Sequence, residues 1–335
     1  MVTMSDVAKI AGVSVSTVSH VVNETRYVKP QTRDTVLAAI GETGYSPNTI
    51  ARSLARASTG LIGLAISVPT NPYFAELVHA IETQAGRRGY MLLLGDTRDD
   101  PAHERKIVRT LRERRVDGLL LAASADPAET LDYLRAQRLP AVLIDRLPSS
   151  DFDRVGPENT ESTARLVQHL GELGHVRIGM VSGLAGLSTS AERVDGYLLG
   201  LDRVGLPFDR RLVATGRSRA EPARFAVRRL LGLPKPPTAL VAANNLMTIG
   251  AVQELRTMGL RVPQDIALVS FDDFQWAELF APRLTTIAQP IHDFGVEAVR
   301  LLLDRLAEPE RDPVAVRLQP AFMHRESCGC SYQPD

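Results

Sequence analysis

The sequence predicts a two-lobed α/β core, made of two doubly wound parallel sheets, preceded by an all-α head of helix-turn-helix type and a short hinge helix. Three observations support this fold class. The first 60 residues have the pattern of short helices separated by tight turns. Beyond Leu61, apolar β-like runs alternate with amphipathic helical patterns, which is typical of parallel sheets covered by helices on both faces. These units are more numerous than one doubly wound sheet needs, so two lobes are the more economical arrangement.

Length and composition indicate a globular protein without a membrane anchor. The chain has 335 residues, of which 44% are hydrophobic and 23% charged, and no apolar run approaches the length of a bilayer span. The first residues lack the basic start and apolar stretch of a secretory signal, so we expect a cytoplasmic location. The formal net charge is zero, but the first 60 residues carry six basic and four acidic side chains, a modest excess that is compatible with contacts to phosphates.

The predicted domains are a head at 1–46, a hinge at 47–59 and a core at 60–335. The core divides into an N-lobe of about 60–158 and 291–320 and a C-lobe of about 159–290 and 321–330, and an effector is expected in the cleft between them. Strands are predicted at 61–68, 90–95, 118–122, 141–145, 178–182, 239–242 and 266–271. Helices are predicted at 75–88, 103–114, 161–173, 192–204, 247–258 and 293–306.

Residues 4–22 have the pattern of two short helices around a tight turn. Ala8 is small where the helices would cross, Gly12 lies where the turn requires a positive φ, and Val18 points back into the shared core. Ser14 can cap the second helix, which leaves its N-terminal face free to enter a major groove. The alternative interpretation is a helical bundle used for protein contacts.

Two further signals follow the second helix. Pro30 at a first-turn position and Gly44 as a terminator predict a third helix. Residues 49–56 then predict a hinge helix too short to be stable alone, so it should become ordered only against a partner helix and DNA. Its Leu54 could act as an apolar wedge between base pairs, with Arg52 near phosphates; the alternative is an ordinary linker.

At this point the sequence resembles the lactose/galactose repressor (LacI/GalR) family, and its head resembles the purine-repressor branch especially. In the head the resemblance rests on Asp6-Val7-Ala8, Val13-Ser14, Thr17-Val18-Ser19, Asn23, Thr32-Arg33, Tyr45-Ser46-Pro47-Asn48 and Ala51-Arg52-Ser53-Leu54. In the core it rests on Asn71-Pro72-Tyr73-Phe74, Val116-Asp117-Gly118, Leu173-Gly174-His175, Asn244-Asn245-Leu246-Met247, Phe271-Asp272-Asp273, Leu284-Thr285-Thr286-Ile287 and Arg325-Glu326-Ser327-Cys328. The resemblance implies a periplasmic-binding-protein-like core and a nucleoid-associated repressor.

The resemblance also implies how DNA is bound. A homodimer would place paired hinge helices in the minor groove, and each recognition helix would read one half of an approximately palindromic double-stranded operator. Val15 can offer only methyl contacts, for instance to thymine. The residues expected to contact DNA are Ser5, Ser14, Val15, Ser16, Thr17, Ser19, His20, Asn23, Arg26, Asn48, Ala51, Arg52, Leu54 and Ala55.

A small polar effector is expected in the core. Effector contacts of the family map onto Tyr73, Phe74, Asp145, Arg193, Asn244, Asp272 and Trp276. Carboxylates that accept hydroxyl hydrogens and a fork of guanidinium donors suit a sugar or a sugar derivative. Structural roles are the alternative: Phe74 in the core, the aspartates as helix caps, Arg193 in an ion pair and Trp276 as a surface anchor. A purine or nucleoside co-repressor is the alternative effector, but Leu187 stands where purine-binding members carry arginine.

Other functions are disfavoured. The sequence has no phosphate-binding loop, zinc-protease motif or nucleophile elbow, so we expect neither an enzyme nor a cofactor. A sugar-binding protein without a DNA role would share the core fold, but the head and the missing export signal argue against it. Cys328 and Cys330 are expected to be reduced thiols in a loose tail, at most half of a metal site, so no metal is predicted.

Overall fold

The computed structural model describes residues 2–23, 26–45, 58–67, 71–148 and 151–330. The chain forms two compact units, Met1–Thr59 and Gly60–Asp335. Positions 47–57 of the predicted hinge, with Asn48, Ala51, Arg52, Leu54 and Ala55, lie outside the described residues. In the described part of the chain, no helix combines the length and apolarity needed to cross a membrane.

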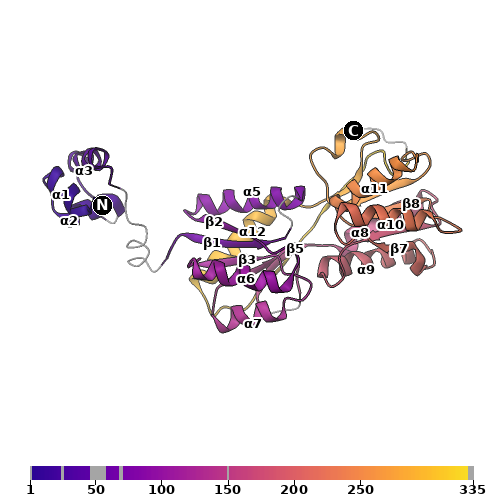
Figure 1. The fold of residues 1–335 in the computed structure, drawn as a ribbon, viewed down its shortest axis with the longest axis horizontal. Coiled ribbons are helices and arrows are strands. Elements are labelled where there is room, and N and C mark those ends of the chain that lie inside the picture. Colours follow the sequence, from indigo (N-terminus) through magenta and orange to yellow (C-terminus); the bar gives the residue numbers. More distant parts are fainter. Residues whose placement is uncertain (1, 24–25, 46–57, 68–70, 149–150, 331–335) are drawn as a thin grey trace. The chain divides into compact units, whose positions relative to one another are not determined.

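The head consists of three helices, α1 (Met4–Ala11), α2 (Val15–Asn23) and α3 (Pro30–Thr43), visible in Figure 1. A capping box between Thr3 and Asp6 starts α1, and Gly12 ends it with a φ of 64°, a conformation that costs glycine little. Ser14 Oγ accepts a hydrogen bond from the Thr17 amide at 3.1 Å at the start of α2. Valines from all three helices form the small core, so α2 keeps its N-terminal face toward solvent.

The N-lobe of the core contains a six-stranded, fully parallel sheet with the order β11-β5-β4-β3-β1-β2. Its strands are β1 (Leu61–Ile66), β2 (Met91–Asp96), β3 (Gly118–Leu121), β4 (Ala141–Ile144), β5 (Asp153–Pro157) and β11 (Ala315–Leu318). Its helices are α5 (Pro72–Arg87), α6 (Pro101–Glu113), α7 (Ala128–Ala136) and α12 (Ile291–Ala307).

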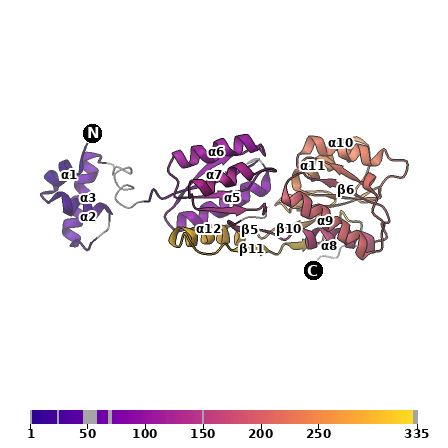
Figure 2. The same ribbon diagram turned by 90° about the horizontal axis from the view of Figure 1, so that it is seen from below.

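The second half repeats the arrangement with the order β12-β10-β9-β8-β6-β7, in which β12 alone runs antiparallel. Its strands are β6 (Ile178–Ser182), β7 (Val213–Thr215), β8 (Ala239–Ala242), β9 (Ala267–Phe271), β10 (Thr285–Ala288) and β12 (Ala321–Met323). Its α-helices are α8 (Thr160–Glu172), α9 (Ser188–Arg203), α10 (Ala220–Leu231) and α11 (Asn245–Thr257), with short 3-10 turns at Arg210–Leu212 and Ala277–Leu279. Figure 2 shows both lobes with helices on either face of a central sheet.

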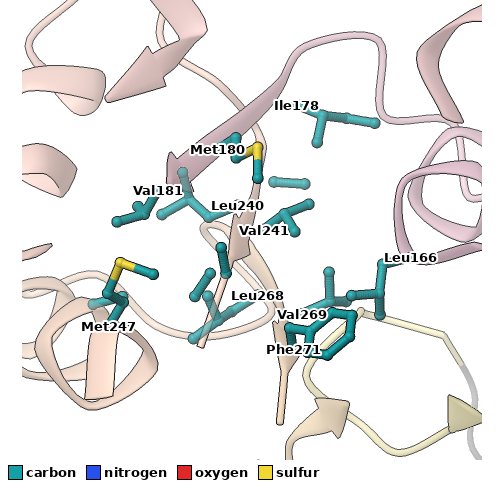
Figure 3. Packing of buried hydrophobic residues seen from close by; sticks show 14 of the residues in the cluster. Leu166, Ile178, Met180, Val181, Leu240, Val241, Met247, Leu268, Val269 and Phe271 are labelled. Atoms are coloured by element: carbon teal, nitrogen blue, oxygen red, sulfur yellow. The ribbon is translucent and has the colours of Figure 1, made fainter. Parts of the chain in front are cut away.

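The predicted fold class is confirmed: an all-α head precedes two doubly wound sheets. The chain passes between the lobes three times, after β5, after β10 and after β11. The central strands of each sheet are fully buried, and Figure 3 shows the apolar side chains of β6, β8 and β9 packed together with Leu166 of α8 and Met247 of α11. Such burial supplies the main stabilising free energy of each lobe. It also fixes the strand ends from which the polar site residues project.

Candidate functional site

A polar cleft lies at the carboxyl ends of the strands of both sheets, where doubly wound folds bind their ligands. Nearly all of its lining residues follow a strand directly or open the next helix. The strand order reverses between β1 and β3 in one lobe and between β6 and β8 in the other, and both switch points face this cleft. The lining residues are Ser67, Asn71, Tyr73, Phe74, Asp99, Asp145, Arg146, Gly183, Leu187, Thr189, Ser190, Arg193, Ser218, Ala243, Asn244 and Asp272.

Tyr73 is held at the start of α5 by the helix cap. The side chain of Asn71 accepts a hydrogen bond from the Tyr73 amide at 3.1 Å, and the Tyr73 hydroxyl donates to Asp145 Oδ1 at 2.8 Å. Burial, followed by the charges of Asp145 and Asp272, raises the pKa of Tyr73 well above its usual value. The hydroxyl therefore stays protonated and orients the Asp145 carboxylate.

Arg193 is buried and clamped in one orientation. Its Nε donates to Asn159 Oδ1 at 2.9 Å, one terminal nitrogen donates to the carbonyl of Ala243 at 2.5 Å, and the guanidinium carbon lies 3.7 Å from the centre of the Phe271 ring. The other terminal nitrogen lies 3.9 Å from Asp272 Oδ1, too far for a hydrogen bond. This nitrogen is therefore a preorganised donor at the cleft.

Asp145 and Asp272 bring two carboxylates into the same cleft. Asp272 accepts a hydrogen bond from Gln289 Nε2 at 2.5 Å. Burial raises the pKa of Asp272, and the opposing charge of Arg193 only partly offsets this rise. Burial likewise raises the pKa of Asp145, against the opposing effects of Arg146 and Arg193. Both residues have positive φ, 63° for Asp145 and 71° for Asp272, in the region that aspartate and asparagine tolerate better than other residues with a side chain.

A second buried guanidinium, that of Arg146, was not predicted from the sequence. It donates to Asp99 Oδ1 at 2.5 Å, to the carbonyl of Ala123 at 3.0 Å and to Ser67 Oγ at 3.2 Å. Arg146 directly follows the predicted residue Asp145, so its position at a strand end could have identified it as a residue of the cleft. Asp99 gave no such signal, because it lies in the loop beyond β2 with a positive φ of 55°.

The structure brings six of the seven predicted effector residues together. Tyr73, Phe74, Asp145, Arg193, Asn244 and Asp272 all line the cleft. Asn244 also caps α11, because its Oδ1 accepts a hydrogen bond from the Met247 amide at 2.8 Å. Trp276 is absent from the residues that line the cleft; it is 38% exposed and stacks on Phe280, with ring centroids 5.8 Å apart.

The described residues that were predicted to contact DNA lie on the head. Ser5, Ser14, Val15, Ser16 and Arg26 are exposed, and Thr17, Ser19, His20 and Asn23 are partly exposed. Asn23 is oriented by hydrogen bonds from its amide nitrogen to Ser19, at 3.0 Å to the carbonyl and 3.2 Å to the hydroxyl. Val15 is 46% exposed at the start of α2.

The two cysteines are free, as predicted, but the prediction that they lie in a loose tail is wrong. Cys328 is fully buried in the core of the C-lobe, and Cys330 is partly buried. Burial alone would raise the pKa of Cys328, but the neighbouring His169 and Cys330 side chains lower it below its usual range. No local sequence pattern indicates this environment, because His169 lies far from the cysteines along the chain.

Comparisons with known proteins agree with this architecture. The model of the "Bacterial regulatory proteins, lacI family" matches residues 3–48, and that of the "Periplasmic binding protein-like domain" matches residues 167–328. The HTH-type transcriptional repressor PurR of Haemophilus influenzae (strain PittEE) is 36% identical over 311 residues, which cover 92% of this chain and 93% of that protein.

Two solved structures are similar over nearly the whole chain. The Lac repressor dimer bound to operator and the anti-inducer ONPF has a TM-score of 0.88 and 29% identity, covering 98% of this chain and 99% of that one. The complex of the transcriptional regulator CelR with cellobiose has a TM-score of 0.73 and 31% identity, covering 98% of this chain and all (100%) of the other.

Proposed function

Because the chain belongs to the LacI family of bacterial regulatory proteins, we propose that it binds a palindromic operator as a homodimer under the control of a sugar or sugar derivative. It is a DNA-binding transcriptional repressor with a small-molecule effector, and its relatives are regulators, not enzymes. The observation that carries the proposal of a sugar is the composition of the cleft, in which buried carboxylates and guanidiniums from both lobes converge. The exposed N-terminal face of α2 would read the operator.

The cleft is suited to several hydroxyl groups. Asp145 and Asp272 can each accept hydroxyl hydrogens, and the Arg193 nitrogen that lies 3.9 Å from Asp272 can donate to a ring or hydroxyl oxygen. Tyr73 and Phe74 add aromatic surface for the apolar face of a sugar ring. Binding energy in such a site comes from replacing hydrogen bonds to water with preorganised ones, which favours ligands with many hydroxyls.

A purine or nucleoside is the second candidate effector. The similarity to PurR proteins supports it. Leu187 argues against it, because this buried apolar side chain lines the cleft at the position where the family resemblance implies an arginine in purine-binding members. Without a donor there, the polar edge of a purine would lose a hydrogen-bonding partner.

The test is a thermal-shift screen of the full-length protein against monosaccharides, disaccharides, sugar phosphates, purine bases and nucleosides. Ligands that bind only the folded protein raise its unfolding temperature in proportion to the logarithm of their concentration above Kd. We expect shifts with sugars that Asp272→Asn abolishes and Trp276→Ala preserves, because Trp276 is not part of the cleft lining.

The same ligands are then added to the protein bound to palindromic fragments selected from its genome. A sugar that shifts the unfolding temperature should also change the affinity for the selected fragment. If only purines or nucleosides raise the unfolding temperature, the second candidate effector replaces the sugar. Equal affinity for selected and scrambled duplexes, with and without ligands, would contradict the operator half of the proposal.

A further inference from the structure

Four side chains with metal-binding atoms meet at the C-terminal edge of the C-lobe, away from the effector cleft. His169 projects from α8, His324 follows β12, and Cys328 and Cys330 end the described chain. One ligand atom from each of these residues lies within 4.8 Å of all the others. From this cluster we propose that the protein binds one zinc ion, or a divalent cation of similar softness, through two imidazoles and two thiolates.

The donor set matches a structural zinc site, and its spacing is somewhat tighter than a bound ion requires. Zinc prefers four ligands of this kind in a tetrahedral arrangement, which places ligand atoms roughly 3.3 to 3.8 Å apart. Within the cluster, Cys328 Sγ lies 3.0 Å from Cys330 Sγ, and His324 Nε2 lies 2.6 Å from Cys330 Sγ. These two separations must open by about 1 Å or less to reach tetrahedral spacing. His324 is exposed and Cys330 partly exposed, so both side chains have room to make this movement.

The backbone favours convergence of the two thiols. Gly329 separates them with a φ of 90°, a conformation that residues with a side chain rarely adopt. Its amide donates to the Glu326 carbonyl at 3.0 Å, which closes a tight turn. Both sulfurs consequently approach the same carbonyl, that of Arg325, at 3.4 Å for Cys328 and 3.7 Å for Cys330.

The histidine side of the cluster is also preorganised. His169 Nε2 is buried and makes no well-aligned hydrogen bond in the described part of the chain, although the His169 side chain interacts with the Cys328 thiol. A buried polar nitrogen without a well-aligned partner is costly, and coordination would remove this cost. The His169 ring packs edge-on against His324, with centroids 5.0 Å apart and an interplanar angle of 79°. It also packs on Phe322 of β12 at 5.3 Å, which holds it in place.

A bound ion would tie the last described segment of the chain to α8. Two thiolates would balance the two positive charges of zinc, so the partly buried complex would carry no net charge and would avoid the penalty for an isolated buried ion. The site would therefore be structural, with all four positions filled by protein and none left for a substrate.

Cobalt(II) titration of the full-length, reduced and metal-stripped protein tests the proposal. The sequence contains only two cysteines, so a thiolate-to-cobalt charge-transfer absorption can come only from this cluster. We expect saturation at one equivalent, visible d–d bands of a tetrahedral ion, and displacement of the cobalt by zinc. Zinc should also raise the unfolding temperature of the protein.

Three variants make the assignment specific. Cys330→Ser and His324→Gln change partly or fully exposed ligands, so they should fold, and each should lose the tetrahedral spectrum and the zinc-induced thermal shift. His292→Gln removes an exposed histidine of the other lobe and should leave both signals intact. Absence of the charge-transfer band in the folded, reduced wild type would overturn the proposal. A band that survives in both ligand variants would also overturn it. So would a protein in which Cys328 and Cys330 remain joined in a disulfide after treatment with a mild reductant.

Discussion

Asp145 and Asp272 occupy equivalent positions in the two lobes. Asp145 follows β4 and Asp272 follows β9, strands that hold the same place in the two sheet orders. Both adopt positive φ, and both are buried with raised pKa. A positive φ and a buried carboxylate both lower the stability of the fold. Their occurrence at matching strand ends indicates that these positions serve ligand binding at the expense of stability.

This cost leads to a prediction for Asp272→Asn. Asparagine tolerates the same φ and removes the charge whose burial raises the pKa, so the ligand-free core should become more stable at neutral pH. Because the folded pKa is raised, the wild type binds its proton more tightly when folded. The destabilisation is thus fully present above the folded pKa and fades as the pH falls toward the ordinary value of 3.8.

Urea unfolding at neutral and mildly acidic pH measures this effect. The stability difference between Asp272→Asn and the wild type should shrink as the pH is lowered. Asp272→Ala is the comparison variant, since alanine removes the charge but disfavours the positive φ, and its gain should be smaller. A stability difference that does not depend on pH would show that the carboxylate is not strained by burial.

At the scale of elements, the helix pair α8 and α9 shows how glycine sets the spacing in the C-lobe. A Cβ on Gly196 would overlap the carbonyl oxygen of Thr160, and one on Gly200 would lie 2.7 Å from the carbonyl oxygen of Ala164. The two glycines are one helical turn apart on α9 and face α8. The close approach matters for the site, because α9 carries Arg193 and α8 begins beside its partner Asn159.

We therefore expect Gly196→Ala to destabilise the core by about 1–3 kcal/mol, as overpacking generally does. The matched control is Gly86→Ala near the end of α5, where a new Cβ meets only the flexible end of Glu82 at 4.0 Å. That variant should stabilise by about 0.4–1 kcal/mol through the unfolded state. Chemical denaturation gives the free energy of unfolding of both variants. Equal effects of the two substitutions would contradict the view that close packing against α8 requires glycine at position 196.

The elements also show where prediction from sequence works and where it stops. β6 and β8 match their predicted ranges because both are short, fully buried apolar runs. β5 (Asp153–Pro157) was missed because it contains Asp153 and Arg154 and ends in proline. The buried Asp153 is neutralised by Arg305 and Arg311 from the far end of the chain, contacts that no local pattern reveals.

The candidate site divides in the same way. Tyr73 and Asp145 stand at strand ends and helix starts, where the resemblance to a known family located them. Arg146 and Asp99 become site residues only through a long-range ion pair, at 2.5 Å between residues 47 positions apart. The cluster of His169 with the cysteines likewise depends on tertiary packing, since α8 and the chain end are distant in sequence.

At the scale of the whole core, one polar network connects the polar cleft to the junction of the lobes. Arg193 donates to Asn159, whose amide donates to Glu192 Oε2 at 2.7 Å. Glu192 on α9 pairs in turn with Arg317 on β11 of the N-lobe at 2.6 Å. Ligand contact with Arg193 can thus bias the relative positions of the lobes through three consecutive hydrogen-bonded contacts, provided that the ligand prefers one arrangement.

The last prediction concerns this junction. Glu192→Gln removes the charge that holds Arg317 while keeping an acceptor for Asn159. The ion pair is partly exposed, with side chains 40% and 22% accessible, so the variant should lose less than about 1 kcal/mol of stability. The coupling between sugar binding and operator binding should be reduced more. The change in the free energy of operator binding that the most stabilising sugar of the thermal screen causes should shrink by about 0.5–2 kcal/mol. Glu161→Gln, which breaks a similar pair with Arg203 inside the C-lobe, should preserve that change. Operator titrations with and without the sugar measure this change in both variants. If the change is equal in the two variants, Glu192 does not take part in transmitting the signal.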